Sequence, residues 1–262
     1  MSFLYDVRLG KVVKSKLYSN GLLLKNLLNK DKAIKELFTG GKQGVWYDPS
    51  DKSTLFQDAA GTVPVTKDGD PVALMRDKSG NGNHAIAPNS ASRPAYKTDG
   101  TLHWLAFDGV DDCIYAHQFS EFIQQPYTIS TGLHVYQVLG EYENIIHSKN
   151  GKARVYFIGE KDNSARLSAG GASLAAAVPF IKDEPSYYRL VFNSAQSSMQ
   201  SNAEIKLSDG KDIGSNPMTD LVIARYHSDT NYCKMRMYSL VVSKNTNEQL
   251  DTYVSQKTGV TL

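Results

Sequence analysis

Apolar and polar residues alternate in short stretches over most of this chain. From residue 45 onward, apolar and aromatic stretches are separated by turn sequences, and the clearest stretches are 127–138, 187–192 and 234–242. Within 187–192, alternate side chains are large and apolar, which places them on one face of a strand. Asn150-Gly151 and Asp209-Gly210 are strong hairpin signals between such stretches. Many short strands joined by regular turns predict a β-sandwich or a β-barrel.

The two ends of the chain follow a different period. In residues 1–43, leucines and other apolar residues recur three and four positions apart, which predicts an amphipathic helical pattern interrupted near Asp31 and ended by Gly40-Gly41. Helices this short cannot form a core alone, so their apolar face must dock on the following domain, on another copy or on a larger assembly. A second helix is predicted near the C-terminus, with Asn245 or Thr246 as its N-cap and Gly259 at its end.

Composition and charge exclude several classes of protein. The chain has 262 residues and a formal net charge of +2, which argues against a dedicated nucleic-acid-binding protein. The charge is uneven, because residues 1–40 carry eight Lys or Arg against three Asp or Glu. Cys113 and Cys233 match no zinc-site spacing and are expected to be buried thiols. Because we find neither a secretory signal nor a membrane span, we expect synthesis in a cytosol and no membrane insertion.

Three separated segments, 77–85, 105–114 and 235–262, resemble the laminin G-like jelly roll of the concanavalin A-like superfamily. The resemblance implies a mainly β fold: a concanavalin A-like antiparallel β-sandwich (jelly roll) with a small N-terminal helical or extended appendage and a short C-terminal helix. We therefore expect one sandwich domain over residues 44–262 and an anchoring or oligomerisation segment over residues 1–43.

A narrower resemblance is carried by residues 44–51, 54–58 and 257–262. These segments are similar to domains in tail-fibre, tail-tip and surface decoration proteins of tailed bacteriophages and prophages. Residues 1–43 lie outside this resemblance, so it says nothing about them.

Side chains that carry oxygen gather in two predicted turns, and each turn has two interpretations. Asp77 and Asn81 lie in the first turn, and Asp108, Asp111 and Asp112 lie in the second. In the structural interpretation these side chains accept hydrogen bonds from backbone N–H groups and shape the turn. In the functional interpretation their oxygens hold calcium, which takes six or more oxygen ligands in flexible geometry. No cofactor is required by the sequence.

Aromatic residues offer a candidate glycan-binding surface, since aromatic rings can stack on the apolar faces of sugars. Tyr142, Tyr226 and Tyr232 lie in turn-like contexts, and we add Trp46 as a candidate. Trp104 is surrounded by apolar residues and is expected in the core.

Catalysis has little support in the sequence. Glycoside hydrolases need two carboxylates that flank the scissile bond. The nearest pair, Glu141 and Glu143, lies beside a glycine in a predicted turn, and we find no nucleophile elbow or phosphate-binding loop. We therefore expect that the chain is not an enzyme.

The resemblance implies a bacteriophage virion structural protein, made in the cytoplasm of the host bacterium, whose sandwich recognises host-surface glycans. We expect a homo-oligomer or many copies in a particle, attached to other virion subunits through residues 1–43, with no nucleic-acid partner. Two alternatives stay open: a glycan-cleaving enzyme on the same fold, and an architectural decoration protein without a ligand.

Overall fold

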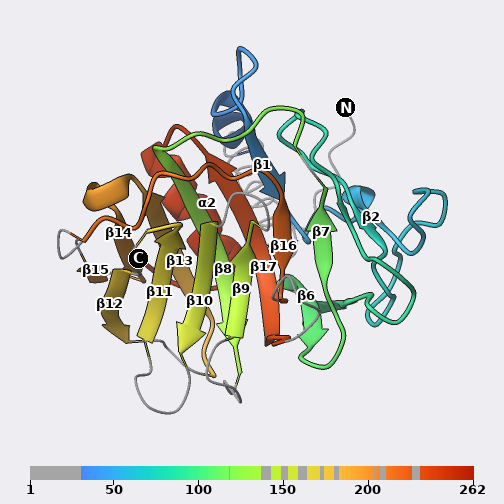
Figure 1. Cartoon of the computed structure of the whole chain (residues 1–262). Coiled ribbons are helices and arrows are strands. Elements are labelled where there is room, and N and C mark those ends of the chain that lie inside the picture. The colour runs from blue at the N-terminus through green and yellow to red at the C-terminus, as the bar shows by residue number, and fades with distance from the viewer. Residues whose placement is uncertain are drawn as a thin grey trace, which may run out of the picture.

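Two antiparallel β-sheets stacked face to face form the body of the protein (Figure 1). The computed structural model describes residues 31–117, 119–136, 143–148, 153–158, 164–171, 174–179, 183–202, 204–206, 211–225 and 231–262. The first sheet has eight strands in the order β15 (Glu204–Lys206), β14 (Ser198–Ser201), β13 (Ser186–Phe192), β8 (Tyr127–Val135), β17 (Lys234–Ser243), β6 (His103–Asp108) and β5 (Ala95–Thr98), with β1 (Gly44–Tyr47) paired to β17.

The second sheet has nine strands. Their order is β12 (Leu174–Pro179), β11 (Ser164–Ala169), β10 (Ala153–Ile158), β9 (Glu143–His147), β16 (Leu221–Ile223), β7 (Ile114–Ala116), β4 (Ala85–Ile86), β3 (Leu74–Met75) and β2 (Leu55–Phe56). The other described elements are two 3-10 turns, η1 (Lys52–Thr54) and η2 (Ser194–Gln196), the helix α2 (Glu248–Thr258) and the helical residues 31–36.

The long strand β17 is the centre of the first sheet. One of its edges pairs with β8 over almost its whole length. Its other edge pairs with β6 through residues 234–237 and with β1 through residues 240–243. The strands β1 and β6 therefore lie end to end along one edge of β17, although about sixty residues separate them in sequence.

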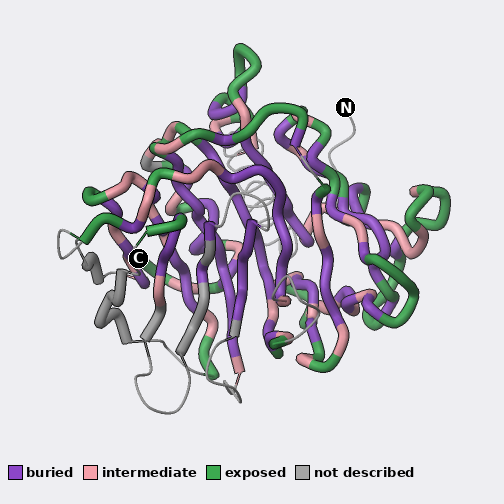
Figure 2. The backbone as a smooth tube through the Cα atoms, in the orientation of Figure 1, coloured by how far each residue is buried: buried purple, intermediate pink, exposed green. Residues whose placement is uncertain are grey.

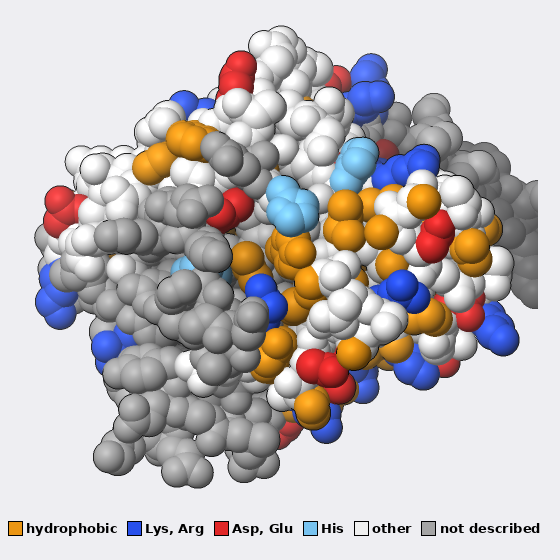
Figure 3. Space-filling view, turned by 45° about the vertical axis from the view of Figure 1, so that its right-hand side comes forward, with side chains coloured by type: hydrophobic (Ala, Val, Ile, Leu, Met, Phe, Trp, Pro, Cys, Tyr) orange, Lys and Arg blue, Asp and Glu red, His pale blue; other side chains and the backbone are white. Residues whose placement is uncertain are grey.

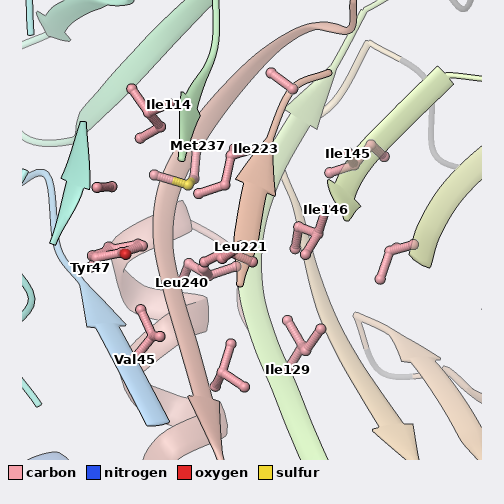
Figure 4. Packing of buried hydrophobic residues seen from close by; sticks show 14 of the residues in the cluster. Val45, Tyr47, Ile114, Ile129, Ile145, Ile146, Leu221, Ile223, Met237 and Leu240 are labelled. Carbon is pink, nitrogen blue, oxygen red and sulfur yellow. The ribbon is translucent and has the colours of Figure 1, made fainter. Parts of the chain in front are cut away.

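The main core lies between the two sheets, where alternate residues of each strand point inward. On β17, Leu240 and Val242 belong to this core, whereas Val241 faces the other side of the sheet. Figure 4 shows Leu221 and Ile223 of β16 directed toward Leu240 and the side chains around it. Buried residues follow the strands through the middle of the molecule, and exposed residues lie mostly in the connecting loops (Figure 2).

A second, smaller core covers the outer face of the first sheet. Residues 31–36 are helical, and Ile34, Leu37 and Phe38 pack with Trp46, Val241 and residues of α2. The apolar face predicted for this part of residues 1–43 thus docks on the sandwich, the first of the three predicted alternatives. Residues 1–30 lie outside the described residues.

Helix α2 is fixed at both ends and along its length. Asn247 is its N-cap, because its side chain accepts a hydrogen bond from Leu250 N–H at 2.9 Å, and Gly259 ends it in the left-handed conformation with φ 76°. The predicted caps, Asn245 and Thr246, lie two positions and one position too early. The Asp251 carboxylate accepts hydrogen bonds from the Tyr187 hydroxyl and the Arg189 guanidinium, which ties the helix to β13.

The predicted mainly β fold is confirmed, with its sandwich of two antiparallel sheets and its final helix. Cys113 and Cys233 are both buried, as expected. In the described part of the chain, no helix combines the length and apolar character needed to cross a membrane.

Candidate functional site

The turn at residues 77–83 is held by its own side chains. The buried Asp77 carboxylate accepts hydrogen bonds from the backbone N–H groups of Trp46 (2.9 Å), Ser79 (2.9 Å) and Asn83 (3.1 Å), and from the Ser79 hydroxyl (2.6 Å). The Asn81 amide donates to the carbonyls of residues 42 and 44. Because both Asp77 oxygens already accept two hydrogen bonds, the structural interpretation accounts for this turn, and Asp77 does not join the other three aspartates in one cluster.

The second predicted oxygen cluster does assemble. Carboxylate oxygens of Asp108, Asp111 and Asp112 lie within 4.8 Å of one another. Burial raises the pKa of Asp112 to about 7. The hydrogen bond that its carboxylate accepts from Asp108 N–H lowers this pKa, whereas the nearby negative charges of Asp108 and Asp111 raise it further. Three carboxylates provide the hard oxygen ligands that calcium prefers, but exposed acidic groups in turns are also common without an ion. Calcium therefore stays a prediction for this turn.

The four predicted aromatic residues do not form one surface. Trp46 is only 2% exposed, because residues 34–38 and α2 cover it, so its predicted place on an exposed surface is wrong. Tyr232 is described and half-buried. Tyr142 and Tyr226 lie outside the described residues, as does Glu141, and the side chain of Glu143 is not described. Trp104 is buried as expected, but on the outer face of the first sheet, 5.7 Å from the Tyr238 ring and beneath the Arg236 guanidinium.

An apolar surface covers the outer side of the short strands of the second sheet. Leu74, Ile86, Tyr115 and Val222 alternate with residues of the main core and therefore face away from it; Ile86 and Tyr115 are half-buried, and Leu74 and Val222 are covered by neighbouring groups. Figure 3 shows hydrophobic side chains gathered on this side of the molecule, with basic residues and histidines around them. These outward residues carry few hydrogen-bonding groups, so this surface is a weak candidate for binding a polar ligand.

A pocket of about 280 Å³ lies where three distant segments meet. The segments are the turn after β1, the loop between β5 and β6, and the C-terminal half of α2. The pocket is lined by Ser50, Thr101, Leu102, His103, Tyr253, Gln256 and Lys257. Six of these seven side chains carry a hydrogen-bonding group, so the pocket suits a small polar ligand.

Beneath the pocket lies a buried ionic network centred on Asp48, which is 1% exposed. Its carboxylate accepts from Tyr253 Oη (2.8 Å), Lys257 Nζ (3.0 Å) and Lys78 Nζ (3.2 Å), and from both the N–H and the hydroxyl of Ser50. Burial alone would raise the pKa of Asp48, but the two ammonium groups and these hydrogen bonds hold it well below its usual range. Asp48 therefore stays charged at all physiological pH values.

His103, at the start of β6, also lines the pocket. Its Nδ1 lies 2.7 Å from Tyr96 Oη, and its ring stacks on the Tyr96 ring at a centroid distance of 6.0 Å. Burial and the positive charge of Lys257 hold the pKa of His103 below its ordinary value, which favours the neutral ring. With Nδ1 engaged by Tyr96, the Nε2 nitrogen is left to donate or accept one hydrogen bond, and a ligand hydroxyl can meet either role.

Asp48, His103 and Lys257 were not identified as site residues from the sequence. Asp48 and Lys257 lay within the segments that carried the narrower resemblance, but that resemblance assigned them no role. A usable signal was an aspartate directly after a strand whose four residues are all buried, since a carboxylate in such a place requires partners.

No protein-family model and no curated protein matches this chain. Among solved structures, it resembles Trypanosoma rangeli sialidase in complex with the inhibitor DANA, with a TM-score of 0.53 and 10% identity, over 90% of this chain and 38% of the sialidase chain. It also resembles a mutant of that sialidase displaying trans-sialidase activity, with a TM-score of 0.52 and 13% identity, over 92% of this chain and 40% of the mutant chain. The botulinum neurotoxin type G receptor-binding domain is similar with a TM-score of 0.50 and 12% identity, over 70% of this chain and 48% of the toxin domain.

These likenesses show the fold. The chain spans less than half the length of each of these three structures, and the identities are too low to carry over any activity. They nevertheless contradict the prediction that the chain is not an enzyme, because sialidases are among the structures that share this β-sandwich. They give no support to the bacteriophage part of the resemblance.

Proposed function

We propose that this chain is a carbohydrate-binding β-sandwich and that the pocket between α2 and the β5–β6 loop takes one sugar unit of a glycan. The observation that carries the proposal is the pocket itself, with its hydrogen-bonding side chains fixed on a buried carboxylate. A site whose polar groups are already in place loses little conformational entropy when a ligand binds.

The chemistry of the lining favours a sugar over an apolar ligand. The Thr101 hydroxyl and the Gln256 amide donate and accept, the His103 ring nitrogen that does not contact Tyr96 does one or the other, and Lys257 donates. Sugar hydroxyls do both, and Leu102 offers the one aliphatic contact in the lining. The fold, shared with a sialidase and with a toxin receptor-binding domain, is compatible with this function.

The test is binding of the full chain to a glycan array, followed by calorimetry with the methyl glycoside of the sugar that binds. Thr101→Trp fills the pocket from an exposed position and should lower the affinity at least about tenfold without unfolding the protein. The control is Lys97→Met, which removes a lysine outside the pocket that pairs with Asp68. If no glycan binds, or if Thr101→Trp binds as the wild type does, the proposal is wrong.

Catalysis is tested with the same glycan. Wild-type protein is incubated with it, and the products are separated and identified. Release of a sugar would make the pocket part of an enzyme, whereas intact glycan after long incubation would leave binding as its activity.

We also propose that the sandwich is displayed on a bacteriophage virion in many copies, with residues 1–43 contacting other virion subunits. Only the sequence segments that resemble phage proteins support this setting. Because Ile34, Leu37 and Phe38 pack into the second core, the test deletes residues 1–30 only. Particles made by the phage or prophage that encodes the chain should contain the full-length protein and lack the shortened one. Particles without the full-length chain would refute the proposal.

A further inference from the structure

Three of the side chains that line the pocket hydrogen-bond to a single buried group. Ser50, Tyr253 and Lys257 come from two segments about two hundred residues apart, and each donates to the carboxylate of Asp48. Asp48 directly follows β1, and the pairing of β1 with β17 fixes the start of this turn to the first sheet.

The two carboxylate oxygens of Asp48 accept hydrogen bonds from different donors. Oδ1 accepts from the Ser50 N–H at 3.0 Å and from the Ser50 hydroxyl at 2.6 Å. Oδ2 accepts from Tyr253 Oη, Lys257 Nζ and Lys78 Nζ at 2.8 to 3.2 Å. A change confined to Oδ2 therefore acts on the α2 side of the pocket and leaves the turn at Ser50 in place.

The two lysines depend on Asp48 to different degrees. Lys78 also pairs with Asp51 at 2.9 Å and Asp31 at 3.3 Å, and its ammonium lies 4.4 Å from the Trp46 ring. Among the described residues, Asp48 is the one carboxylate that pairs with Lys257. Loss of the Asp48 charge would leave Lys78 well paired, whereas Lys257 would lose its carboxylate partner and keep only its hydrogen bond to Ser50 Oγ and its contact with the Tyr253 ring.

We propose that Asp48 is a positioning residue for the carbohydrate pocket: without touching the ligand, it fixes Lys257 and Tyr253 in the arrangement that binds it. This inference rests on the proposed function. It adds that the affinity of the pocket is set by a group buried beneath it.

The test compares Asp48→Asn with Asp51→Asn. Both variants remove a carboxylate that pairs with Lys78, but only Asp48 contacts side chains that line the pocket. In Asp48→Asn the carbonyl oxygen can still accept from Ser50, while an amide NH₂ replaces Oδ2 and cannot accept from Tyr253 or Lys257. The probe is the tightest binder among methyl glycosides of glucose, galactose, mannose, N-acetylglucosamine and N-acetylneuraminic acid, measured by calorimetry.

We expect Asp48→Asn to weaken binding about tenfold or more and Asp51→Asn to leave it within about twofold. Because Asp48 is proposed to act largely through Lys257, Asp48→Asn should weaken binding far less in a Lys257→Met background than in the wild type. Equal losses in the two backgrounds, or wild-type affinity in Asp48→Asn, would overturn the inference. If the wild type binds none of the glycosides, the proposed function has failed instead.

A second variant keeps the test decisive if Asp48→Asn does not fold. Tyr253→Phe removes one hydrogen bond to Oδ2, and with it the hydroxyl that accepts from Trp46 Nε1, but it leaves the buried charge paired with both lysines. Tyr253→Phe should weaken binding about threefold. When the lysines are labelled by reductive methylation, the NMR resonance of the Lys257 methyl groups should shift between the wild type and Tyr253→Phe. An unchanged affinity together with an unchanged resonance would count against positioning by Asp48.

Discussion

Removing the Asp77 carboxylate should destabilise the whole sandwich, and the size of the effect follows from the groups it bonds. Asp77→Ala leaves three buried backbone N–H groups, those of Trp46, Ser79 and Asn83, without their acceptor. Each buried donor left without a partner costs about 1–3 kcal/mol. Allowing for partial rescue by water, we expect the free energy of unfolding to fall by about 3–6 kcal/mol.

A loss of this size is a large part of the total stability of a typical domain, which is about 5–15 kcal/mol. The assay is urea unfolding followed by the fluorescence of the two tryptophans, Trp46 and Trp104. With a slope of about 2.5 kcal/mol per molar urea, a loss of about 4 kcal/mol would lower the midpoint by about 1.6 M. The control is Asp99→Ala, which removes an exposed carboxylate that accepts from Thr101 N–H and Leu102 N–H, both open to water. Its cost should stay below about 1 kcal/mol.

The same experiment separates the two interpretations of this turn. If hydrogen bonds alone occupy the Asp77 carboxylate, EDTA should leave the wild-type midpoint unchanged. If calcium is bound there, EDTA should lower the wild-type midpoint and leave Asp77→Ala unaffected. A loss below about 1 kcal/mol in Asp77→Ala would refute the reasoning from buried donors.

Three further perturbations test other parts of the structure. Gly132→Ala drives its Cβ into Thr258 Oγ1 and should cost about 2–3 kcal/mol in urea unfolding, with partial recovery in a Thr258→Ala background. Phe38→Ala leaves a cavity in the second core and should lower the free energy of unfolding by about 3 kcal/mol. An unchanged free energy of unfolding would mean that residues 34–38 do not pack on the sandwich. The pKa of Asp112 is about 7 in the folded protein, above its ordinary 3.8, so the folded form binds an extra proton between these values. Stability should therefore fall as pH rises from about 4 to about 7, and Asp112→Asn should be more stable than the wild type at about pH 8 by about 1 kcal/mol in the absence of calcium. Added calcium that raises the wild-type melting temperature at that pH, but not that of Asp112→Asn, would place the ion in this turn.

The architecture could be predicted from the sequence because its signals are local. Alternation along 187–192 matches the alternately buried side chains of β13, and glycines near 80 and 109 mark turns where the backbone takes positive φ. The helical stripe that contains Ile34 and Phe38 was equally visible. The surface on which this stripe docks could not be predicted, because the period of a helix does not specify what covers its apolar face. Trp46 was misplaced for the same reason.

The candidate site could not be predicted, because it exists only after folding. Asp48 meets Tyr253 and Lys257 across more than two hundred residues, and His103 arrives from a third segment. None of these residues belongs to a motif with fixed spacing. Only the turn at Asp108, where the acidic residues are neighbours in sequence, could be recognised in advance as a cluster.

The central position of β17 has a consequence for synthesis on the ribosome. Until residues 234–243 emerge, no strand joins β8, β6 and β1, so the first sheet stays in three parts: β8 with β13, β14 and β15, β6 with β5, and β1 alone. Such late, long-range pairing is slow and leaves strand edges open to neighbouring nascent chains. We expect a truncated chain that stops before residue 234 to aggregate when expressed, and the yield of the full chain to depend on chaperones that shield those edges until translation ends.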